Sequence, residues 1–184
     1  MLEINFTPFP TLTTDRLILR QMTDADGEVM QFMRSDQGVM KYIKRPPTKT
    51  LEEAIAFIQR INLAVANNES VMWAITLKGD DTLIGNMCLW RIQPDNYRAE
   101  IGYALHPAHQ GEGIMTEAVN AAVDYAFNTM GLHSLEGQMD PANTASARVL
   151  EKAGFVREGY FKENFFYEGS FYDSAVYSLI APAR

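Results

Sequence analysis

Cysteine and basic residues are scarce in this 184-residue chain, and long apolar runs are absent. The single cysteine, Cys88, cannot form an internal disulfide, which fits a reducing compartment. Acidic residues outnumber basic ones by 23 to 16, and the resulting net charge of −7 argues against nucleic acid as a partner. No segment approaches the roughly 18 apolar residues of a membrane span, and the first residues lack a signal-peptide pattern. We therefore expect a cytoplasmic protein that binds neither nucleic acid nor a membrane.

The remaining composition is that of a globular protein, with 47% hydrophobic and 21% charged residues. No internal repeat, low-complexity tract or linker marks a boundary, so we expect one domain over residues 1–184. His106 and His109 are spaced like metal ligands, but no third ligand motif accompanies them. The sequence therefore predicts a site without metal.

The most informative segment is a glycine-containing loop between a strand pattern and a helix pattern. Residues 99–105 have the pattern of a strand, and a helix pattern begins at Ile114, directly after Gly111 and Gly113. Glycine has no side chain to hold a ligand away from the backbone, and the first turn of a helix offers unpaired N–H groups at its positive end. This combination predicts an anion site that is best suited to phosphate.

The other patterns predict an α/β fold. Two apolar runs joined by Gly79, Asp80 and Asp81 predict an antiparallel hairpin. A strand at residues 135–139 follows the helix after the loop, so this crossover places it parallel to the strand before the loop. The other expected elements are a strand at 11–20, helices at 25–33, 50–66 and from Asn143 to Gly154, and closing strands at 155–159 and 171–180, separated by the aromatic segment 160–167.

Two better-known phosphate motifs do not fit the loop. A P-loop requires a lysine directly after its second glycine, and none is present here. The dinucleotide fingerprint Gly-x-Gly-x-x-Gly is matched at Gly111 and Gly113, but Thr116 stands in place of the third glycine. Two glycines near a helix start also serve as ordinary turn residues. A dinucleotide-binding oxidoreductase is therefore only a third alternative.

Two segments carry a family resemblance. The segment Gln110-Gly111-Glu112-Gly113-Ile114-Met115 resembles the Gln/Arg-x-x-Gly-x-Gly/Ala motif of the GNAT acetyltransferase superfamily. The segment from Asn143 to Phe155 is similar to the second signature of that superfamily, Asn-x-x-Ser followed by Glu-Lys-x-Gly-Phe. Residues 14–20, with Gly169, Tyr172 and Asp173, resemble the branch that acetylates the N-terminal amines of ribosomal proteins. Met115 departs from the first motif, and its side chain would have to turn inward against the sheet.

The resemblance implies a single-domain GNAT-like fold. Its sheet would be mixed and mostly antiparallel, with helices on both faces and a splayed parallel strand pair. It further implies acetyl-coenzyme A as co-substrate, with the pyrophosphate on the glycine loop and the pantetheine arm paired with the strand before it. The implied coenzyme-binding residues are Tyr103, Ala104, Leu105, Gln110, Gly111, Glu112, Gly113, Ile114, Met115, Thr116, Asn143, Ser146 and Lys152.

The implied reaction is direct attack of an amine on the thioester, which requires a base and a proton donor for the leaving thiolate. Glu100 alternates with the apolar residues of its strand, and the resemblance assigns it as the base; the alternative is a solvated strand residue. The resemblance assigns Ser146 as the proton donor, with Tyr160 in reserve, while a first-turn polar residue is the simpler interpretation of Ser146. Asn143 also fits a helix N-cap, and Lys152 also fits a residue that complements the dipole at a helix end.

We therefore expect an acetyl-coenzyme A-dependent N-acetyltransferase. A protein N-terminal amine is the first choice of acceptor, since its pKa of about 8 leaves more neutral amine at pH 7 than the pKa of about 10.4 of lysine. A small amine is the second choice, such as a polyamine, an amino acid or an aminoglycoside. A non-catalytic acyl-coenzyme A binding module is the competing class, and a homodimer is left open.

Overall fold

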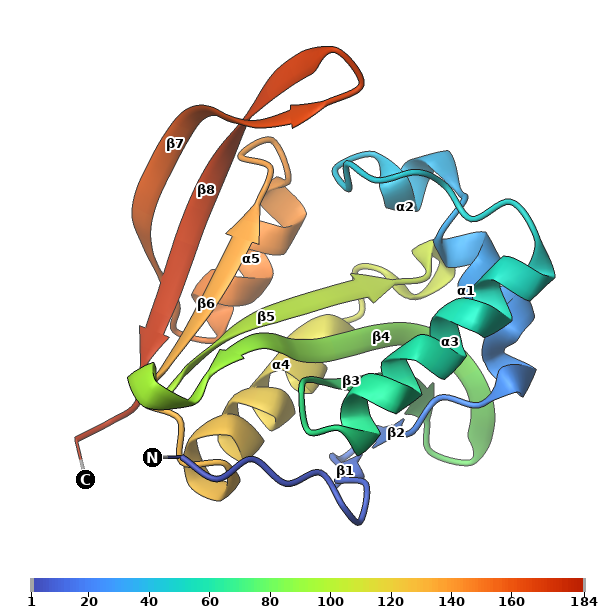
Figure 1. The fold of residues 1–184 in the computed structure, drawn as a ribbon, viewed down its shortest axis with the longest axis horizontal. Helices are drawn as coiled ribbons and strands as arrows, with labels where there is room; N and C mark the ends of the chain where they lie inside the picture. Colours follow the sequence, from blue (N-terminus) through green and yellow to red (C-terminus); the bar gives the residue numbers. More distant parts are fainter. Residues whose placement is uncertain (1, 184) are drawn as a thin grey trace.

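Eight strands form one sheet in the order β1-β2-β3-β4-β5-β6-β8-β7 (Figure 1). The computed structural model describes residues 2–183 of the chain. Every neighbouring pair of strands is antiparallel except β5 and β6, so the mixed, mostly antiparallel sheet is confirmed. The strands are β1 (Leu12–Thr13), β2 (Leu17–Arg20), β3 (Val71–Leu77), β4 (Asp80–Gln93), β5 (Arg98–Leu105), β6 (Ser134–Met139), β7 (Val156–Tyr167) and β8 (Ser170–Ile180).

Helices cover both faces of the sheet, as predicted. On one face α4 buries Ala118 and Ala122, whose small side chains let the helix lie close to the strands. On the other face α1 and α3 bury Met30 and Ile58 against Ala74 of β3. None of the helices within residues 2–183 is long and apolar enough to cross a membrane. The helices are α1 (Gly27–Met33), α2 (Gln37–Met40), α3 (Leu51–Ala66), α4 (Ile114–Asp124) and α5 (Thr144–Lys152), with a π-helical turn at Tyr125–Thr129 after α4.

Helix α3 begins after Thr50 and ends at Asn67. The hydroxyl oxygen of Thr50 accepts the N–H of Glu53 at 3.2 Å, which satisfies one of the unpaired donors of the first turn. Asn67 ends the helix, and Asn68 follows in the left-handed conformation with φ of 60°. Both ends of α3 therefore agree with the prediction from sequence.

The parallel strands β5 and β6 pair only over their first residues. Arg98 to Glu100 lie opposite Ser134 to Glu136, and beyond this point β6 pairs with β8 alone. The two strands then diverge, as Figure 1 shows, while β5 continues to Leu105. This is the splayed parallel pair that the family resemblance implies.

Three elements differ from the expectation. The strand expected at 11–20 is divided into β1 and β2 by a turn in which the N–H of Thr14 donates to the carbonyl of Leu17 at 3.0 Å. Helix α2 was not predicted, because four residues are too few to show a helical period. The aromatic segment 160–167 is part of β7 and does not separate two strands. Nearly all of its side chains are exposed, so the alternation that marks a half-buried strand is absent.

Gly85 provides a test of how closely β4 and β5 must approach each other beside the end of β5. A Cβ atom added at Gly85 would lie 2.8 Å from the carbonyl oxygen of Ala104 and 2.9 Å from Cδ1 of Leu105. A backbone carbonyl within a sheet cannot rotate away, so Gly85→Ala should lower the free energy of unfolding by about 1–3 kcal/mol. Urea denaturation measures this change, and wild-type stability would contradict the close approach.

Candidate functional site

A cavity of about 410 Å³ lies where the end of β5 meets the glycine loop and the first turns of α4 and α5. All the predicted coenzyme-binding residues except Glu112 line it. The further lining residues come from the segment around α2 and from α5: Gly38, Val39, Tyr42, Ile43, Ala145, Arg148 and Val149. Of these, only Arg148 was a candidate from the sequence, since it lies four residues before Lys152 and could meet coenzyme phosphates with it. The residues around α2 gave no signal because only the fold brings them to the cavity.

The glycine loop has the backbone that an anion site requires. Gly111 and Gly113 are in the left-handed region, with φ of 83° and 78°, where glycine is the residue without strain. A Cβ at Gly111 would meet no atom within 4 Å, so the open side of the loop is free for a ligand. Gly113 is the N-cap of α4 and has no side chain to bond the first-turn N–H groups. These donors, at the positive end of the helix dipole, suit a pyrophosphate.

The side chain of Met115, which departs from the family motif, turns inward. Met115 is 6% exposed and belongs to the hydrophobic core with Ile114. Its length therefore fills the core beneath the loop. Because the Met115 side chain is turned inward, the loop can still bind a ligand through its backbone N–H groups.

A network of hydrogen bonds from residues 14–16, near the N-terminus, holds the glycine loop in place. Glu117, in the first turn of α4, accepts from the Thr14 hydroxyl at 2.6 Å, from the Arg16 N–H at 2.9 Å and from Arg16 Nε at 2.7 Å. Arg16 Nη1 then donates to the carbonyl oxygen of Glu112 at 3.1 Å. Burial opposes the charged form of Glu117, but these hydrogen bonds outweigh it and hold the pKa of that carboxyl below its ordinary value. Glu112 thus meets Arg16 through its carbonyl and does not line the cavity.

Asn143 and Ser146 lie together at the start of α5. The side-chain oxygen of Asn143 accepts the N–H of Ser146 at 3.2 Å, so Asn143 is the helix N-cap and also lines the cavity. The Ser146 hydroxyl donates to the Tyr103 hydroxyl at 3.0 Å, and Tyr103 donates to the main-chain carbonyl of Ser146, also at 3.0 Å. Burial raises the pKa of Tyr103 to about 12, so its hydroxyl is protonated at neutral pH. Sequence reasoning named Tyr103 as a coenzyme contact and missed this pairing, because the two residues are 43 positions apart.

Glu100 is 9% exposed and lies outside the cavity lining. Its Oε2 accepts from Arg91 Nη1 at 3.0 Å, but the side chain of Arg91 is 59% exposed, so solvent screens the pair. Burial therefore dominates and raises the pKa of the Glu100 carboxyl, while the charge and hydrogen bond of Arg91 oppose the shift. The position is not the solvated face of a strand.

Gly102, in the middle of β5, lies in a regular part of the sheet. Gly102 pairs in register with Cys88, and the bulge falls on β4 between Trp90 and Gln93, where Arg91 has φ of 47°. A Cβ at Gly102 would lie 3.0 Å from the sulfur of Cys88, so the glycine makes room for the thiol. Burial, together with the charge of Glu100, raises the pKa of Cys88 to about 12, so the thiol is a poor nucleophile.

Of the remaining candidate residues, Lys152 lines the cavity, whereas Tyr160 and His106 do not. Tyr160 is 51% exposed on β7, its hydroxyl donates to Asp173, and it does not line the cavity. Lys152, the last residue of α5, is exposed at the cavity wall with Arg148 one turn before it. His106 packs on Phe32, with ring centroids 4.7 Å apart. Residues 2–183 contain no group of three or more side chains suited to a metal ion.

Comparisons with known proteins agree with the geometry of this site. Residues 16–156 match the family model of the acetyltransferase (GNAT) domain. The chain is 34% identical to the uncharacterized N-acetyltransferase YoaA of Bacillus subtilis, over 95% of this chain and 98% of YoaA. It is 36% identical to the uncharacterized N-acetyltransferase p20 of Bacillus licheniformis, over 80% of this chain and 83% of p20.

A solved structure has the same fold. The GNAT-family acetyltransferase of Bacillus anthracis superposes with a TM-score of 0.83 at 29% identity, covering 93% of this chain and 98% of that one. The chain therefore belongs to the acetyltransferase (GNAT) family. It is an acetyl-coenzyme A-dependent N-acetyltransferase, and its acceptor is an amine.

The network around Arg16 predicts that residues outside the cavity control coenzyme affinity. Arg16→Ala removes the donor to the Glu112 carbonyl, so the Kd for acetyl-coenzyme A should rise about tenfold, or about 1.4 kcal/mol. Glu117→Gln should raise it similarly, because it weakens the hold on Arg16. Lys78→Ala is the control, since it removes an exposed positive charge next to the same turn without touching the loop. Calorimetry that gives all three variants the wild-type Kd would refute the role of this network.

Proposed function

We propose that this N-acetyltransferase acetylates α-amines, with the coenzyme bound along the cavity and Glu100 as the base. The observation that carries this proposal is the arrangement of the cavity, in which a phosphate-suited loop and the Ser146–Tyr103 hydroxyl pair belong to one lining. The divergence of β5 from β6 leaves Tyr103, Ala104 and Leu105 with a free edge for the amide groups of a pantetheine arm. These features support the assignment of the coenzyme-binding residues that the family resemblance implies.

Each group has a chemical step in this proposal. The amine nitrogen attacks the thioester carbon, and Glu100, directly or through water, accepts the proton that the nitrogen loses. The carbon–sulfur bond then breaks, and the thiolate takes a proton from the Ser146 hydroxyl. Tyr103, whose hydroxyl is hydrogen-bonded to that of Ser146, can then return a proton to Ser146. A carboxyl pKa raised by burial is closer to neutrality and makes a better base than an ordinary glutamate.

The relatives support an α-amine more than a lysine. The ribosomal-protein-serine acetyltransferase of Escherichia coli is 35% identical over 79 residues, 43% of this chain and 44% of that one. An α-amine of pKa about 8 demands less of the base than a lysine side chain. Polyamines are the second candidate, because the spermidine N(1)-acetyltransferase of Vibrio cholerae is 26% identical over 78% of this chain.

Replacement of Glu100 tests the base through rate and stability together. Glu100→Gln should lower kcat about 10²-fold while acetyl-coenzyme A binds as before. The folded-state pKa of Glu100 is raised, so its ionisation destabilises the fold, and this cost sets in as pH rises through that pKa. The variant should therefore unfold at the same or higher temperature than wild type at pH 8. The wild-type rate should fall as pH drops through the pKa of Glu100.

Glu158→Gln on the exposed part of β7 is the matched control, and it should leave rate and stability unchanged. A peptide with a free N-terminus but no lysine should accept acetyl groups, and its N-terminally blocked form with one lysine should not. A rate for Glu100→Gln within threefold of wild type would remove Glu100 as the base.

Variants at three hydroxyl groups separate the candidate proton donors. Ser146→Ala and Tyr103→Phe should each slow thiol release about tenfold, because the departing thiolate loses its source of a proton. The melting temperature of Ser146→Ala should change little, since the better helix propensity of alanine offsets one lost hydrogen bond. Thr144→Ala, exposed in the same turn, is the control. Slow turnover of Tyr160→Phe with a normal rate for Ser146→Ala would assign the role to Tyr160.

A further inference from the structure

Arg45, in the segment between α2 and α3, has no carboxylate partner among residues 2–183. Four other arginines each bond a carboxylate: Arg16 to Glu117, Arg20 to Asp26, Arg91 to Glu100 and Arg98 to Glu136. The Nε of Arg45 is buried, and no atom of the described residues accepts a hydrogen bond from it. Its Nη2 has only a weak acceptor, the sulfur of Met40 at 3.9 Å.

A second guanidinium increases the positive charge at this place. Arg34 lies close enough to Arg45 for repulsion, and burial, followed by the charges of Arg45 and Arg60, lowers the pKa of Arg34 to about 10. Arg34 is held in place, since its Nε donates to Thr48 at 2.9 Å and its guanidinium lies 3.8 Å from the ring centroid of Phe57. Neither contact supplies a negative charge, so the pair is a partly buried cationic centre without a counter-charge, which is costly in a folded protein.

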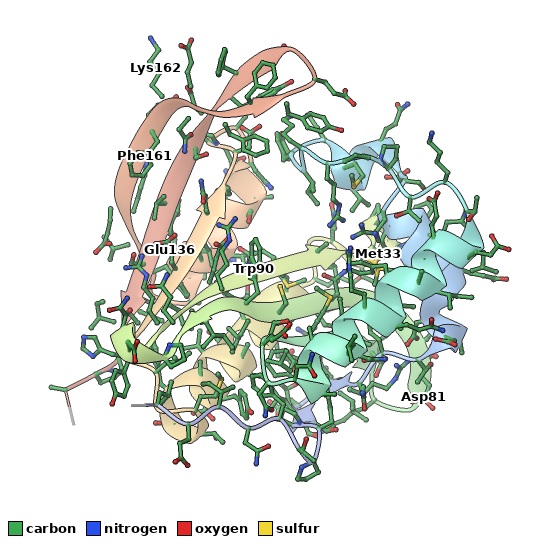
Figure 2. All side chains as sticks on the ribbon, viewed as in Figure 1. Met33, Asp81, Trp90, Glu136, Phe161 and Lys162 are labelled. Carbon is green, nitrogen blue, oxygen red and sulfur yellow. The ribbon has the colours of Figure 1, made fainter. Side chains whose placement is uncertain are left out.

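The cationic pair lies beside the segment around α2 that lines the cavity. Gly38, Val39, Tyr42 and Ile43 line the cavity, and the N–H of Arg45 donates to the carbonyl of Ile43 at 3.2 Å. The charge of Arg45 acts on Cys88, which pairs with Gly102 two residues beyond Glu100 on the same face of β5. In the view of Figure 2, Trp90, the register partner of Glu100, lies between Glu136 of β6 and Met33 of α1. The charges of Arg45 and Glu100 both act on the Cys88 thiol, so the two residues lie near the same part of the sheet.

We propose that Arg45 binds a carboxylate carried by the acceptor, so that the substrate is a primary amine with an acidic group near the reacting nitrogen. This inference rests on the proposed function and narrows its substrate class. A guanidinium forms two parallel hydrogen bonds with a carboxylate, and burial strengthens such a pair. The same centre repels polycations, so it disfavours polyamines and aminoglycosides. Free amino acids and peptides with an acidic residue near the N-terminus both have the required chemistry.

Matched acceptors that differ only in their carboxylates test the substrate class. The first pair is glutamate and its diamide, and the second is the amidated tripeptides Ser-Asp-Ala and Ser-Asn-Ala; spermidine is the cationic comparison. Wild type should show a kcat/KM at least tenfold higher for the acidic member of one or both pairs, and spermidine should be the poorest acceptor. The pair that shows the preference distinguishes a free amino acid from a peptide.

Arg45→Met, which retains length and apolar character without charge, should abolish this preference and leave the Kd for acetyl-coenzyme A unchanged. Lys49→Met is the control, because it removes an exposed charge from the same segment. Arg45→Met should also unfold at the same or higher temperature than wild type, since it removes a buried charge without a partner. This measurement excludes misfolding as the cause of lost preference.

The outcomes separate the two proposals. Equal use of acidic and neutral acceptors, a preference for spermidine, or an unchanged preference in Arg45→Met would overturn the inference and leave α-amine acetylation standing. Absence of thiol release with every amine would overturn the proposed function. In that case calorimetric binding of glutamate and its diamide to wild type and Arg45→Met still decides the inference, which requires tighter binding of the acid to wild type alone.

Discussion

The early end of pairing between β5 and β6 is the constraint on which the site depends. A strand that is paired along its whole length has its backbone groups occupied on both edges. Strand β5 loses β6 as a neighbour after Glu100 and continues for five residues with that edge unpaired. The gap receives the starts of α4 and α5, the two helices that flank β6 in sequence. Helix α5 lies close to β6, since a Cβ at Gly137 would be 2.7 Å from Cδ1 of Leu150. One irregularity in the sheet thus brings a free strand edge and two helix starts together.

The glycine loop shows how a flexible segment can be held without filling the space that a ligand needs. Two left-handed glycines shape the loop from within, but glycine leaves the unfolded chain more freedom and provides no contacts. The contacts come instead from Thr14 and Arg16, which reach the far side of the loop through Glu117 and the Glu112 carbonyl. These bonds lie outside the cavity, so the first-turn donors of α4 stay available. The loop is therefore rigid on one side and open on the other.

Burial opposes the charges of Glu100 and of the Arg34–Arg45 pair, with complementary consequences. Burial disfavours the charged form of Glu100, and the exposed Arg91 offsets this only in part. Burial equally disfavours the charge on Arg34 and Arg45, although neither loses its proton at neutral pH. In the proposed reaction, an amine that carries a carboxylate would give Glu100 a proton and Arg45 a negative charge. The free protein maintains both groups at a cost in stability, which is typical of residues retained for function.

The sequence by itself determined the glycine loop, the two family signatures, the helix caps at Thr50 and Asn143, and the parallel arrangement of β5 and β6, because these follow from local spacing and chain connectivity. It did not determine α2, the full length of β7 or the position of the bulge, where periodicity is too short or absent. Only the tertiary structure decided that Tyr103 meets Ser146, that Arg16 holds the loop, and that the Nε of Arg45 is buried without an acceptor among the described residues. Each of these depends on residues far apart in the chain, and burial and pairing of charge are properties of the packed fold.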